Sequence, residues 1–335
     1  MDAIVLVGGQ GTRLRPLTAH RHKSLVPVCN VPAIEHLFRW LEESGCGRIV
    51  LAIGQDNDDL ARAYPPVRRG RVEFVHVMER ERLESGGAIR NAVRTAGVEG
   101  RFVVLNGDVF VDFDFAAALR AHEAAGADLT LALTPVEDPS HFGVAVLDDH
   151  GIVEGFVEKP PPGTAPSKLV NAGVWIFEPG LVGEIAPGAV RVEETLFPSL
   201  VARRRAVLGY TFAGPWADIG TPARYLELNL GLLAGGHAEG DQPGVEGSLR
   251  GPGVVLGDGV TIVRSVLGRE TTVGSNAVVE DSVTWESVQI GDGARVRRSV
   301  IADGVSIGAG AEVDGAVIGR GARVEAGVRL TVGSS

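Results

Sequence analysis

Apolar runs alternate with segments of helical periodicity over the first two thirds of the chain. Runs rich in Val, Ile, Leu and Phe predict buried strands at residues 3–7, 48–53, 72–77 and 102–105. Residues 33–43 place apolar side chains three or four positions apart, which predicts a helix. A second helix is expected over 86–95, with Ser85 as its N-cap. Strands that alternate with helices form βαβ units, so the pattern predicts an α/β, Rossmann-like domain with a mostly parallel sheet.

Beyond residue 233 the pattern becomes a repeat with a period of seventeen residues. Three columns recur, separated by steps of six, five and six residues. They are Leu256, Val273, Ile290, Ile307 and Val324; Ile262, Val279, Val296, Val313 and Leu330; and Leu267, Thr284, Ile301 and Ile318, the last preceded by Val266, Val283, Val300 and Val317. Three short faces in each turn predict a parallel β-helix, whose coils stack at about 4.8 Å.

The change of pattern predicts two domains in the 335 residues. Residues 1–233 are expected to form the first domain, and 251–335 the β-helix. Residues 234–250 are expected to be a linker and the approach to the solenoid, because their first half is rich in glycine. A disordered Gly/Val tail would not keep its columns in register over successive turns.

Composition excludes several classes of protein. A net charge of −10 argues against nucleic acid as the main partner, because phosphate backbones need basic faces. No apolar run approaches the length of a membrane span, so no membrane partner is expected. The only cysteines are Cys29 and Cys46, and no signal peptide precedes the first strand. A reduced, cytoplasmic location without a disulfide is therefore expected.

A glycine-rich loop follows the first predicted strand. Gly8, Gly9 and Gly11 carry no Cβ, so backbone N–H groups can crowd around a phosphate. Arg13 and Arg15 follow at once and supply positive charge. The loop lacks the Gly-Lys-Ser/Thr ending of a Walker motif, and its glycine spacing is not that of a dinucleotide loop. A flexible turn is the competing interpretation, but the two arginines favour a nucleoside triphosphate.

Two aspartates lie where loops are expected in the first domain. Asp108 follows the predicted strand 102–105, and Asp218 lies in a glycine-containing segment, 216–221. Hard oxygen ligands from separate strands, with positions left open for phosphate oxygens, suit Mg²⁺. A single Asp is more often a turn or cap residue. The phosphate-type loop nearby in the chain favours the metal interpretation.

Three further polar residues are ambiguous when each is taken alone. Lys159 follows Glu158 and precedes a proline, and it could reach a phosphate as a point charge. A surface Glu–Lys pair explains it equally well. Lys23, at the end of the first loop, has the same two interpretations. Asn171 precedes a predicted strand at 174–177 and offers an amide for sugar hydroxyls.

Together these segments resemble the motifs of one enzyme family. In chain order they are Gly8-Gly9-x-Gly11-Thr12-Arg13-Leu14-x-Pro16-Leu17-Thr18, Lys23, Asn106-Gly107-Asp108, Glu158-Lys159-Pro160, Asn171-Ala172-Gly173 and Trp216-x-Asp218-x-Gly220-Thr221. The set resembles the sugar-1-phosphate nucleotidyltransferases, also called nucleotide-sugar pyrophosphorylases. The resemblance covers the whole chain, because a C-terminal left-handed β-helix is common in that family. It looks closest to the mannose-1-phosphate guanylyltransferases, on Leu6-Val7-Gly8-Gly9 and the β-helix.

The resemblance implies a role for each matching residue. The nucleotide would be bound by Leu6, Gly8, Gly9, Gly11, Thr12, Arg13, Ser85, Gly86 and Asn106. The sugar phosphate would be bound by Gly143, Glu158, Lys159 and Asn171. Asp108 and Asp218 would hold Mg²⁺, the implied cofactor. Arg13, Lys23 and Lys159 would be the catalytic residues.

The chain departs from the family's motifs at two places. His22-Lys23-Ser24 replaces the usual Pro-Lys-Pro, which leaves the rigidity around Lys23 open. Ser85-Gly86-Gly87 replaces a more usual Thr-Ala-Gly, which could alter the preference for a base. The resemblance therefore implies the family more firmly than it implies a particular substrate pair.

The implied reaction is a direct displacement. An oxygen of the sugar phosphate attacks the α-phosphorus of an NTP, and pyrophosphate leaves in line. Lys159 would orient the attacking phosphate, Mg²⁺ would bridge the reactants, and Arg13 with Lys23 would stabilise the pyrophosphate. GTP and mannose 1-phosphate are the expected pair, and GDP-mannose is the expected product.

Other functions stay open on the sequence. A glucose-1-phosphate thymidylyltransferase or uridylyltransferase is the nearest alternative, because few side chains decide the base. A regulatory subunit that senses nucleotide sugars is a non-catalytic alternative, but it would be expected to lose a metal ligand or a phosphate lysine. Acyl transfer by the β-helix would need a histidine base, and the last histidine, His237, precedes the solenoid. The solenoid is then expected to be an assembly or regulatory element, and a homo-oligomer is expected because solenoid faces pack sideways readily.

Overall fold

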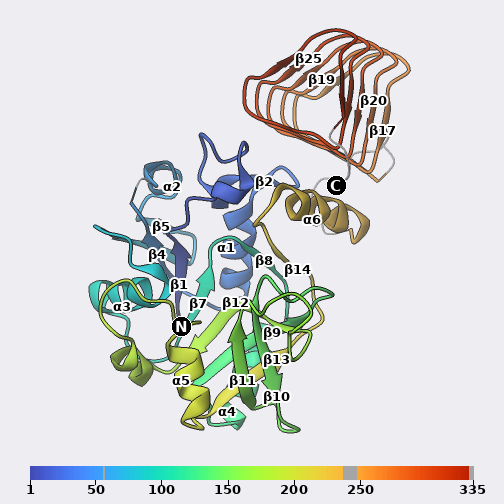
Figure 1. Ribbon diagram of the computed structural model, residues 1–335. Helices are drawn as coiled ribbons and strands as arrows, with labels where there is room; N and C mark the ends of the chain where they lie inside the picture. Colours follow the sequence, from blue (N-terminus) through green and yellow to red (C-terminus); the bar gives the residue numbers. More distant parts are fainter. Residues whose placement is uncertain (56, 237–246, 332–335) are drawn as a thin grey trace. The chain divides into compact units, whose positions relative to one another are not determined.

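The structure is a computed structural model that describes residues 1–55, 57–236 and 247–331 (Figure 1). Strands and helices alternate as far as α6 (Pro222–Ala234), and from β15 (Leu249–Arg250) to residue 331 the regular elements are all strands. The predicted fold class, an α/β domain followed by a parallel β-helix, is confirmed.

Contacts divide the chain into two compact units that do not follow chain order. The first holds Met1–Gly9 and Ile34–Ala217, and the second holds Gln10–Ala33 and the chain from Asp218 onward. The glycine-rich loop is thus divided after Gly9. Hydrophobic patterning reports what a segment buries but not which distant segment it contacts, so the sequence did not indicate this division.

A ten-stranded mixed sheet forms the centre of the first unit. Its strands are β1 (Asp2–Val7), β4 (Arg48–Ile53), β5 (Arg68–Arg69), β6 (Val72–Met78), β7 (Phe102–Asn106), β9 (Leu129–Pro135), β10 (Gly143–Leu147), β11 (Val153–Glu158), β12 (Leu169–Phe177) and β13 (Val207–Thr211). Their order is β11-β10-β12-β7-β1-β4-β6-β5, with β9 paired to β12 and to β13. The strands predicted at 3–7, 48–53, 72–77 and 102–105 form the parallel part, β7-β1-β4-β6. Beyond β7 the sheet continues through antiparallel β12, and β10 joins β11 by a short turn, which only antiparallel strands allow.

The carboxyl ends of the central parallel strands lie level with one another. Leu6 near the end of β1 is in register with Ala52 of β4 and with Asn106 of β7. The N–H of Gly107 continues this ladder by donating to the carbonyl of Leu6 at 2.9 Å. The loops after β1 and β7, which carry Gly8 and Asp108, therefore leave from one edge of the sheet.

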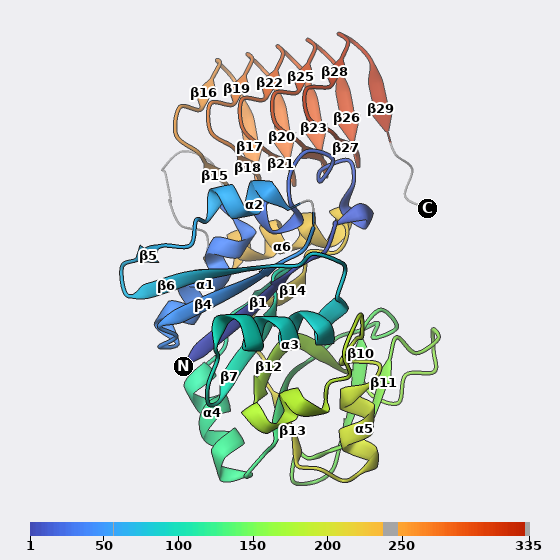
Figure 2. The same ribbon diagram turned by 90° about the vertical axis from the view of Figure 1, so that its left-hand side faces the viewer.

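Helices cover the sheet of the first unit. They are α1 (Ala33–Glu43), α2 (Asp58–Ala63), α3 (Glu84–Ala96), α4 (Phe115–Ala124), η3 (Pro179–Glu184) and α5 (Leu196–Ala202). α1 has the predicted bounds, and it buries Ile34, Leu37 and Leu41 as its periodicity requires. α3 packs against β1, β4 and β6 (Figure 2). A small second sheet joins β8 (Val109–Val111) to β14 (Trp216–Asp218), so part of the segment expected to be a loop is a strand.

Ser85 is not the N-cap of α3, contrary to the sequence prediction. The helix begins at Glu84, and Leu83 is the N-cap residue. Ser85 lies inside the first turn, where its hydroxyl accepts the N–H of Val192 at 3.1 Å and donates to the carboxylate of Glu193. A partner distant in sequence thus takes the hydroxyl that would otherwise cap the helix.

The second unit contains the solenoid and the short elements of residues 10–33. The short elements are η1 (Thr12–Leu14), η2 (Lys23–Leu25), β2 (Pro27–Val28) and β3 (Val31–Pro32). Three five-stranded parallel sheets form the solenoid. The first is β15, β18 (Val266–Leu267), β21 (Val283–Thr284), β24 (Val300–Ile301) and β27 (Val317–Ile318). The second is β16 (Val255–Leu256), β19 (Thr272–Val273), β22 (Gln289–Ile290), β25 (Ser306–Ile307) and β28 (Arg323–Val324), and the third is β17 (Thr261–Val263), β20 (Val278–Glu280), β23 (Arg295–Arg297), β26 (Glu312–Asp314) and β29 (Arg329–Thr331).

The predicted columns of the solenoid are confirmed. Val279 pairs with Val296, and Val296 with Val313, each seventeen residues further along the chain. Most column residues are buried and pack into one core, which also takes in small side chains such as Ala277 and Ala294. The seventeen-residue period is therefore one complete coil, and each column is a row of side chains stacked inside it.

A ladder of buried serines, absent from the sequence predictions, recurs every seventeen residues at Ser248, Ser265, Ser282 and Ser299 and secures one corner of these coils. The hydroxyl of Ser265 accepts the N–H of Ser282 at 3.1 Å and donates to the carbonyl of Val263 at 2.8 Å. The hydroxyl of Ser282 accepts the N–H of Ser299 at 3.1 Å in the same way. Each serine satisfies a backbone group of the next coil that would otherwise be buried without a partner.

The segment joining the two predicted domains is described only at its ends. α6 includes Ala234, and Leu249 of β15 already pairs with Val266 in the first solenoid sheet. Residues 237–246 of the predicted linker lie outside the described residues. The predicted domain boundaries at 233 and 251 stay a prediction.

Cys29 and Cys46 are free thiols, as expected. Burial raises the pKa of Cys29 to about 12 and that of Cys46 to about 11, so both are protonated near neutral pH. Within the described ranges, no helix has the length and apolar character needed to cross a membrane.

Ser282→Ala is predicted to lower the free energy of unfolding by about 1–3 kcal/mol, because the buried N–H of Ser299 loses its acceptor. Ser275→Ala, which removes a hydroxyl from a partly exposed turn of the neighbouring coil, is the control and is expected to stay within about 0.5 kcal/mol. Urea denaturation followed by circular dichroism measures both variants. Equal stabilities would contradict the role of the ladder.

Candidate active site

Glycines allow the backbones to close together at the carboxyl edge of the parallel strands. A Cβ on Gly54 would lie 2.7 Å from the Cα of Gly8, and a Cβ on Gly107 would lie 2.3 Å from Cγ1 of Val7. A larger residue at Gly54 or Gly107 would therefore push these strand ends apart. Gly9 is exposed, and a Cβ there would meet nothing within 4 Å, which leaves room beside the backbone for a ligand.

Glu79 lies beside this loop and was missed by the sequence analysis. A Cβ on Gly8 would lie 3.7 Å from Oε2 of Glu79, and the same oxygen accepts the N–H of Leu83 at 3.4 Å. Glu79 is 8% exposed, and burial raises the pKa of its carboxyl above the ordinary value. Its surroundings in the chain, Met78-Glu79-Arg80-Glu81-Arg82, have the composition of an exposed charged loop, so they gave no signal of a buried acid.

Gly11 turns the rest of the glycine-rich loop back on itself in the second unit. Its φ is +60°, and a Cβ there would lie 2.9 Å from the Cβ of Lys23. The hydroxyl of Thr18 fixes the turn by donating to the carbonyl of Gly11 at 2.7 Å. Thr12 and Arg13 are exposed in η1, and the Arg13 side chain makes no hydrogen bond or ion pair to any described residue. Its guanidinium is thus available to an anionic ligand.

Lys23 is buried against a carboxylate in the same unit. Its Nζ lies 3.6 Å from Oδ1 of Asp218, and Nη1 of Arg224 donates to Oδ2 of Asp218 at 3.2 Å. Lys23 begins η2, where Nδ1 of His22 accepts the N–H of Ser24 at 3.2 Å. This cap restrains the turn without the two prolines usual in the family that the sequence resembles. His22 thus contributes one hydrogen bond to the turn whose rigidity the sequence left open.

The solenoid holds the loop of Lys23 through a buried aromatic junction. Nε1 of Trp285 donates to the hydroxyl of Tyr225 at 2.9 Å, and that hydroxyl donates to the carbonyl of Pro27. The guanidinium of Arg21 lies over the Trp285 ring, 4.9 Å from its centroid, and its Nη2 is 2.9 Å from Oδ2 of Asp303. Trp285 and Tyr225 are 2% and 0% exposed. Residues 21–27 are therefore anchored to both α6 and the solenoid.

Two further hydrogen bonds fix the end of the same loop. Oδ1 of Asn229 in α6 accepts the N–H of Cys29 at 2.8 Å, and Nδ2 of Asn30 donates to the carbonyl of Leu267 at 3.0 Å. Cys29 and Asn30 both have positive φ, which makes the tight turn between β2 and β3. The loop is thus held by polar contacts on either side of the aromatic junction.

Asn106 and Asn171 lie on neighbouring strands of the first unit. A Cβ on Gly173, whose φ is +74°, would lie 2.8 Å from Nδ2 of Asn106, so only glycine leaves the Asn106 amide its place. Oδ1 of Asn171 accepts the N–H of Gly173 at 3.1 Å and Nε1–H of Trp175 at 2.7 Å. These bonds stabilise an irregularity within β12, so Asn171 lies inside the strand and not at its entrance. Its NH₂ group remains as a donor.

Gly143, Glu158 and Lys159 come together where β10 pairs with β11. Gly143 is opposite Glu158, and a Cβ on Gly143 would lie 2.8 Å from Oε2 of Glu158. The glycine thus lets the carboxylate lie across the neighbouring strand. Lys159 has φ +47°, is half-exposed, and pairs its Nζ with Oε1 of Glu158. A non-glycine residue in this conformation is strained, which is common where a side chain must be aimed.

Ser85 and Gly86 contact the segment that leads into α5. The N–H of Gly86 donates to the carbonyl of Val190 at 2.8 Å, and a Cβ on Gly86 would lie 2.9 Å from Cγ2 of Val190. The Ser85 hydroxyl is engaged by Val192 and Glu193. The predicted contacts of Ser85 and Gly86 with a nucleoside stay a prediction, and they would use the remaining atoms of these residues.

Glu193 is a second acid that the sequence analysis missed, and it is partly buried. Burial raises the pKa of its carboxyl, while the hydrogen bond from Ser85 and the charge of Lys159 oppose the rise and the charge of Glu158 adds to it. Its carboxyl thus titrates under the influence of the predicted sugar-phosphate residues. Glu193 is followed by Glu194, a pattern typical of a solvated surface, so the chain offered no local sign of its partial burial.

The predicted metal ligands lie in different units. Asp108 follows β7 in the first unit, Asp218 ends β14 in the second, and both are partly exposed. Among the described residues, no group of three or more His, Cys, Asp and Glu side chains could hold a metal by itself. Carboxylate oxygens fit Mg²⁺, which binds through one or two carboxylates and completes its shell with water and substrate phosphates.

Comparison with models of protein families shows to which family the chain belongs. A model of the nucleotidyl transferase family matches residues 2–235, more than half of the sequence. The chain belongs to this family. A second model, for the LbH domain of EIF2B subunit epsilon, matches residues 245–330. LbH stands for left-handed β-helix, so the predicted hand of the solenoid is confirmed.

Several relatives within the nucleotidyl transferase family carry specific names. Mannose-1-phosphate guanylyltransferase catalytic subunit beta of Drosophila pseudoobscura pseudoobscura is 34% identical over 227 residues, which is 67% of this chain and 60% of that protein. The protein of the same name in Danio rerio is 36% identical, over 68% of this chain and 63% of that protein. The mannose-1-phosphate guanylyltransferase of Mycobacterium tuberculosis is 32% identical over 79% and 75%. The chain thus spans less than two thirds of the length of the animal relatives.

Solved structures support the fold of the same region. HddC from Yersinia pseudotuberculosis has a TM-score of 0.57 at 25% identity, over 68% of this chain and 97% of that one. A Bacillus anthracis protein, provisionally named a glucose-1-phosphate thymidylyltransferase, has a TM-score of 0.63 over 73% and 97%. At 22% identity, the second likeness shows the fold alone.

Trp285→Ala is predicted to lower the free energy of unfolding by about 3–5 kcal/mol, because it empties a buried indole site. Trp285→Phe keeps a ring but loses the donor to Tyr225, and a smaller loss of about 1–2 kcal/mol is expected. Guanidinium denaturation measures both. Val67→Ala, at an exposed position outside the junction, is the control. A Trp285→Ala variant as stable as the control would show that the junction does not hold the loop.

Proposed function

We propose that the chain transfers a guanylyl group from GTP to mannose 1-phosphate, which gives GDP-mannose and pyrophosphate. The observation that carries this proposal is the 32–36% identity to proteins named mannose-1-phosphate guanylyltransferase in animals and in Mycobacterium tuberculosis. The motif residues of the resembling family support it, because Arg13, Lys23, Asp108, Lys159 and Asp218 are all present. A regulatory subunit without catalysis would be expected to lack some of them.

The proposed reaction is a single displacement at phosphorus. A phosphate oxygen of mannose 1-phosphate forms a bond to the α-phosphorus of GTP, and the bond from that phosphorus to the oxygen bridging to the β-phosphate breaks. Pyrophosphate leaves in line with the bonding electrons, so no side chain has to act as a nucleophile. Catalysis then depends on positioning and on stabilisation of charge.

Cationic side chains have distinct parts in this reaction. Lys159 would orient the attacking phosphate, for which its half-exposed ammonium and fixed backbone are suited. Arg13 and Lys23 would balance the charge of the departing pyrophosphate. Mg²⁺, held by Asp108 and Asp218, would polarise the phosphate oxygens when bound.

The remaining contacts are proposed residue by residue. Those with the nucleotide are Leu6, Gly8, Gly9, Gly11, Thr12, Ser85, Gly86 and Asn106. Those with the sugar phosphate are Gly143, Glu158 and Asn171. The open backbone at Gly9 and the NH₂ group of Asn171 support these two sets respectively.

Glu79 supports guanine as the base. An ionised carboxylate offers only acceptors, and guanine presents two neighbouring donors, N1–H and N2–H₂. Uracil and thymine present one N–H between two carbonyl oxygens, one of which would face the carboxylate and be repelled. Because Glu79 lies beside Gly8, a nucleotide on the glycine-rich loop would bring its base within reach of this carboxylate.

A cytoplasmic homo-oligomer is part of the same proposal. The two free, buried thiols suit a reducing compartment. Apolar side chains lie exposed at both ends of the described solenoid, at Val255 and at Val328 and Leu330, which supports assembly through the β-helix. The mass of the native protein in solution tests whether it is a homo-oligomer.

Asp108→Ala is predicted to lower kcat at least about a hundredfold and to leave the fold intact, because a proposed metal ligand is lost. Pyrophosphate release from GTP and mannose 1-phosphate in the presence of Mg²⁺ is the measurement. Asp112→Ala removes an exposed carboxylate four residues further on and serves as the matched control. Full magnesium-dependent turnover by Asp108→Ala would overturn the assignment.

In the wild type, the rate of pyrophosphate release with GTP and mannose 1-phosphate is expected to exceed the rates with ATP, CTP, UTP or dTTP and either mannose or glucose 1-phosphate.

Glu79→Gln is predicted to raise KM for GTP at least about tenfold, because an amide donates where guanine needs an acceptor. In the same variant, the KM values for UTP and dTTP are expected to fall relative to the KM for GTP. A protonated carboxyl loses acceptor capacity, so the wild-type KM for GTP should rise as the pH falls. Because burial raises the pKa of Glu79, this rise should begin at a pH above the ordinary pKa of a glutamate side chain. Unchanged selectivity across the nucleotides would remove Glu79 from base recognition.

A further inference from the structure

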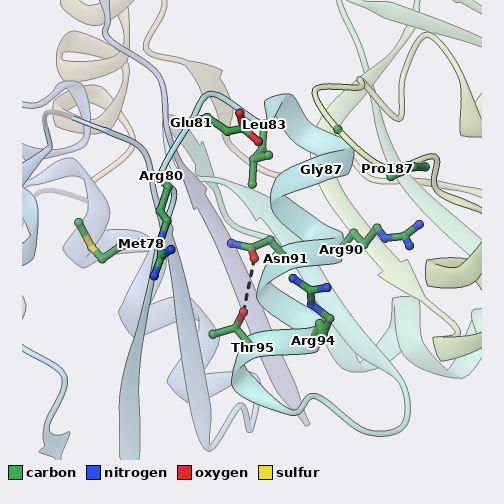
Figure 3. Close-up of a pocket in the computed structure, with 11 residues that line it drawn as sticks. Met78, Arg80, Glu81, Leu83, Gly87, Arg90, Asn91, Arg94, Thr95 and Pro187 are labelled. Atoms are coloured by element: carbon green, nitrogen blue, oxygen red, sulfur yellow. Dashed lines mark hydrogen bonds between the residues drawn. The ribbon is translucent and has the colours of Figure 1, made fainter.

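A hollow of about 560 Å³ opens on the outer face of α3 in the first unit (Figure 3). One wall is the end of β6 with the residues that follow it, Met78 and Arg80. The other walls are the face of α3 turned away from the sheet and the turn at Pro187 and Gly188. None of the residues proposed above to contact nucleotide, sugar phosphate or metal lines this hollow.

Positive charge predominates in the hollow. Arg80, Arg90 and Arg94 line it, against a single carboxylate, Glu81. Within the described part of the chain, none of these three guanidiniums takes part in an ion pair. Like charges within one concavity repel one another, and this chain has a net charge of −10. An anion is the partner that would balance the three arginines.

Arginines outside the hollow form ion pairs, in contrast to the three arginines that line it. Both oxygens of Glu84 are used, one by Arg82 at 2.7 Å and one by Arg191 at 3.1 Å. Arg205 is likewise paired with Asp128 at 2.5 Å. Carboxylates in this unit therefore neutralise arginines elsewhere on the surface and leave the hollow positive.

The donors of the hollow are arranged to receive several anionic oxygens. Nη1 of Arg90 donates to the carbonyl of Ile185 at 2.6 Å, which fixes the guanidinium at one rim and leaves its other N–H groups. Arg94 follows one turn further along α3, and Arg80 lies across from it, with Asn91 between them (Figure 3). Oδ1 of Asn91 accepts the hydroxyl of Thr95 at 3.4 Å, so its NH₂ group is a further donor.

Size and apolar surface point to a ligand larger than a phosphate ion. A volume of about 560 Å³ is in the range of sites for whole cofactors and drug-sized molecules. Met78 is 47% exposed beside the arginines, and Leu83 and Pro187 add apolar surface. A ligand with two phosphates and a planar, weakly polar body matches both parts of the lining.

We propose that this hollow is a second nucleotide site, which binds a nucleoside diphosphate, free or linked to a sugar. The site is coupled to the start of α3, because a Cβ on Gly87 would lie only 2.3 Å from the carbonyl oxygen of Gly188. The turn at Gly188 leads directly to Val190 and Glu193, which hold Gly86 and Ser85. A ligand that orders this contact changes the affinity at Ser85 and Gly86, and this coupling rests on the proposed function, whereas binding in the hollow does not.

Isothermal titration with GDP tests the site. The wild type is compared with Arg80→Ala/Arg94→Ala and with Arg68→Ala/Arg71→Ala, which removes the same charge from the exposed hairpin of β5 and β6 in the same unit. The proposal expects two GDP per wild-type and control chain and one per Arg80→Ala/Arg94→Ala chain, or a loss of at least about tenfold in affinity at one site. If the proposed function is wrong and only the hollow binds GDP, the wild-type and control chains bind one GDP each and the Arg80→Ala/Arg94→Ala chain binds none. The difference of one GDP per chain is therefore the same in both cases.

Two outcomes would overturn the proposal. The first is an Arg80→Ala/Arg94→Ala variant that binds GDP with the wild-type stoichiometry and with affinities within twofold. The second is inorganic pyrophosphate that binds to the hollow as tightly as GDP, because the nucleoside would then contribute nothing. GDP-mannose, titrated in parallel, distinguishes the two sources: tighter binding than GDP assigns the sugar-linked form, and weaker binding assigns the free diphosphate. Circular dichroism melting of each variant confirms that the chain is folded.

Discussion

The buried contact between Trp285 and Tyr225 is the constraint on which the second unit depends. One indole from the solenoid and one phenol from α6 meet over the loop that carries Lys23, and the phenol reaches the loop's backbone at Pro27. Arg21 closes the junction between Trp285 and Asp303. The solenoid therefore has a structural role of its own, because its side chains fix the backbone from which a proposed catalytic lysine extends.

Paired charges are the second theme of the proposed active site. Lys23 lies against Asp218, and Lys159 lies against Glu158, each within its own unit. Both lysines are thus held by a carboxylate before any phosphate arrives, which limits the cost of burying or restraining their charge. Binding of anionic substrates would exchange one partner for another. Arg13 differs, since its exposed guanidinium has no such partner among the described residues.

Periodic features were predictable from the sequence, whereas contacts between distant residues were not. The seventeen-residue columns and the bounds of α1 followed from spacing alone, because burial repeats with the period of the element. The junction joins residues 198 and 60 positions apart, so no local pattern encodes it. Glu79 and Glu193 are acids in charged segments that resemble solvated surface, and only the fold shows that the first is buried and the second partly buried. Ser85 failed as a cap for the same reason, since its hydroxyl partner lies 108 positions away.

Isotope exchange tests the proposed displacement most directly. Labelled pyrophosphate and GTP are incubated with the wild-type protein and Mg²⁺, without and with GDP-mannose. A single displacement without a covalent enzyme intermediate predicts labelled GTP only when GDP-mannose is present, because pyrophosphate must attack an acceptor-bound guanylyl group. Exchange between GTP and pyrophosphate in the absence of any sugar compound would reveal a guanylylated side chain. That result, or no labelled GTP under either condition, would contradict the account.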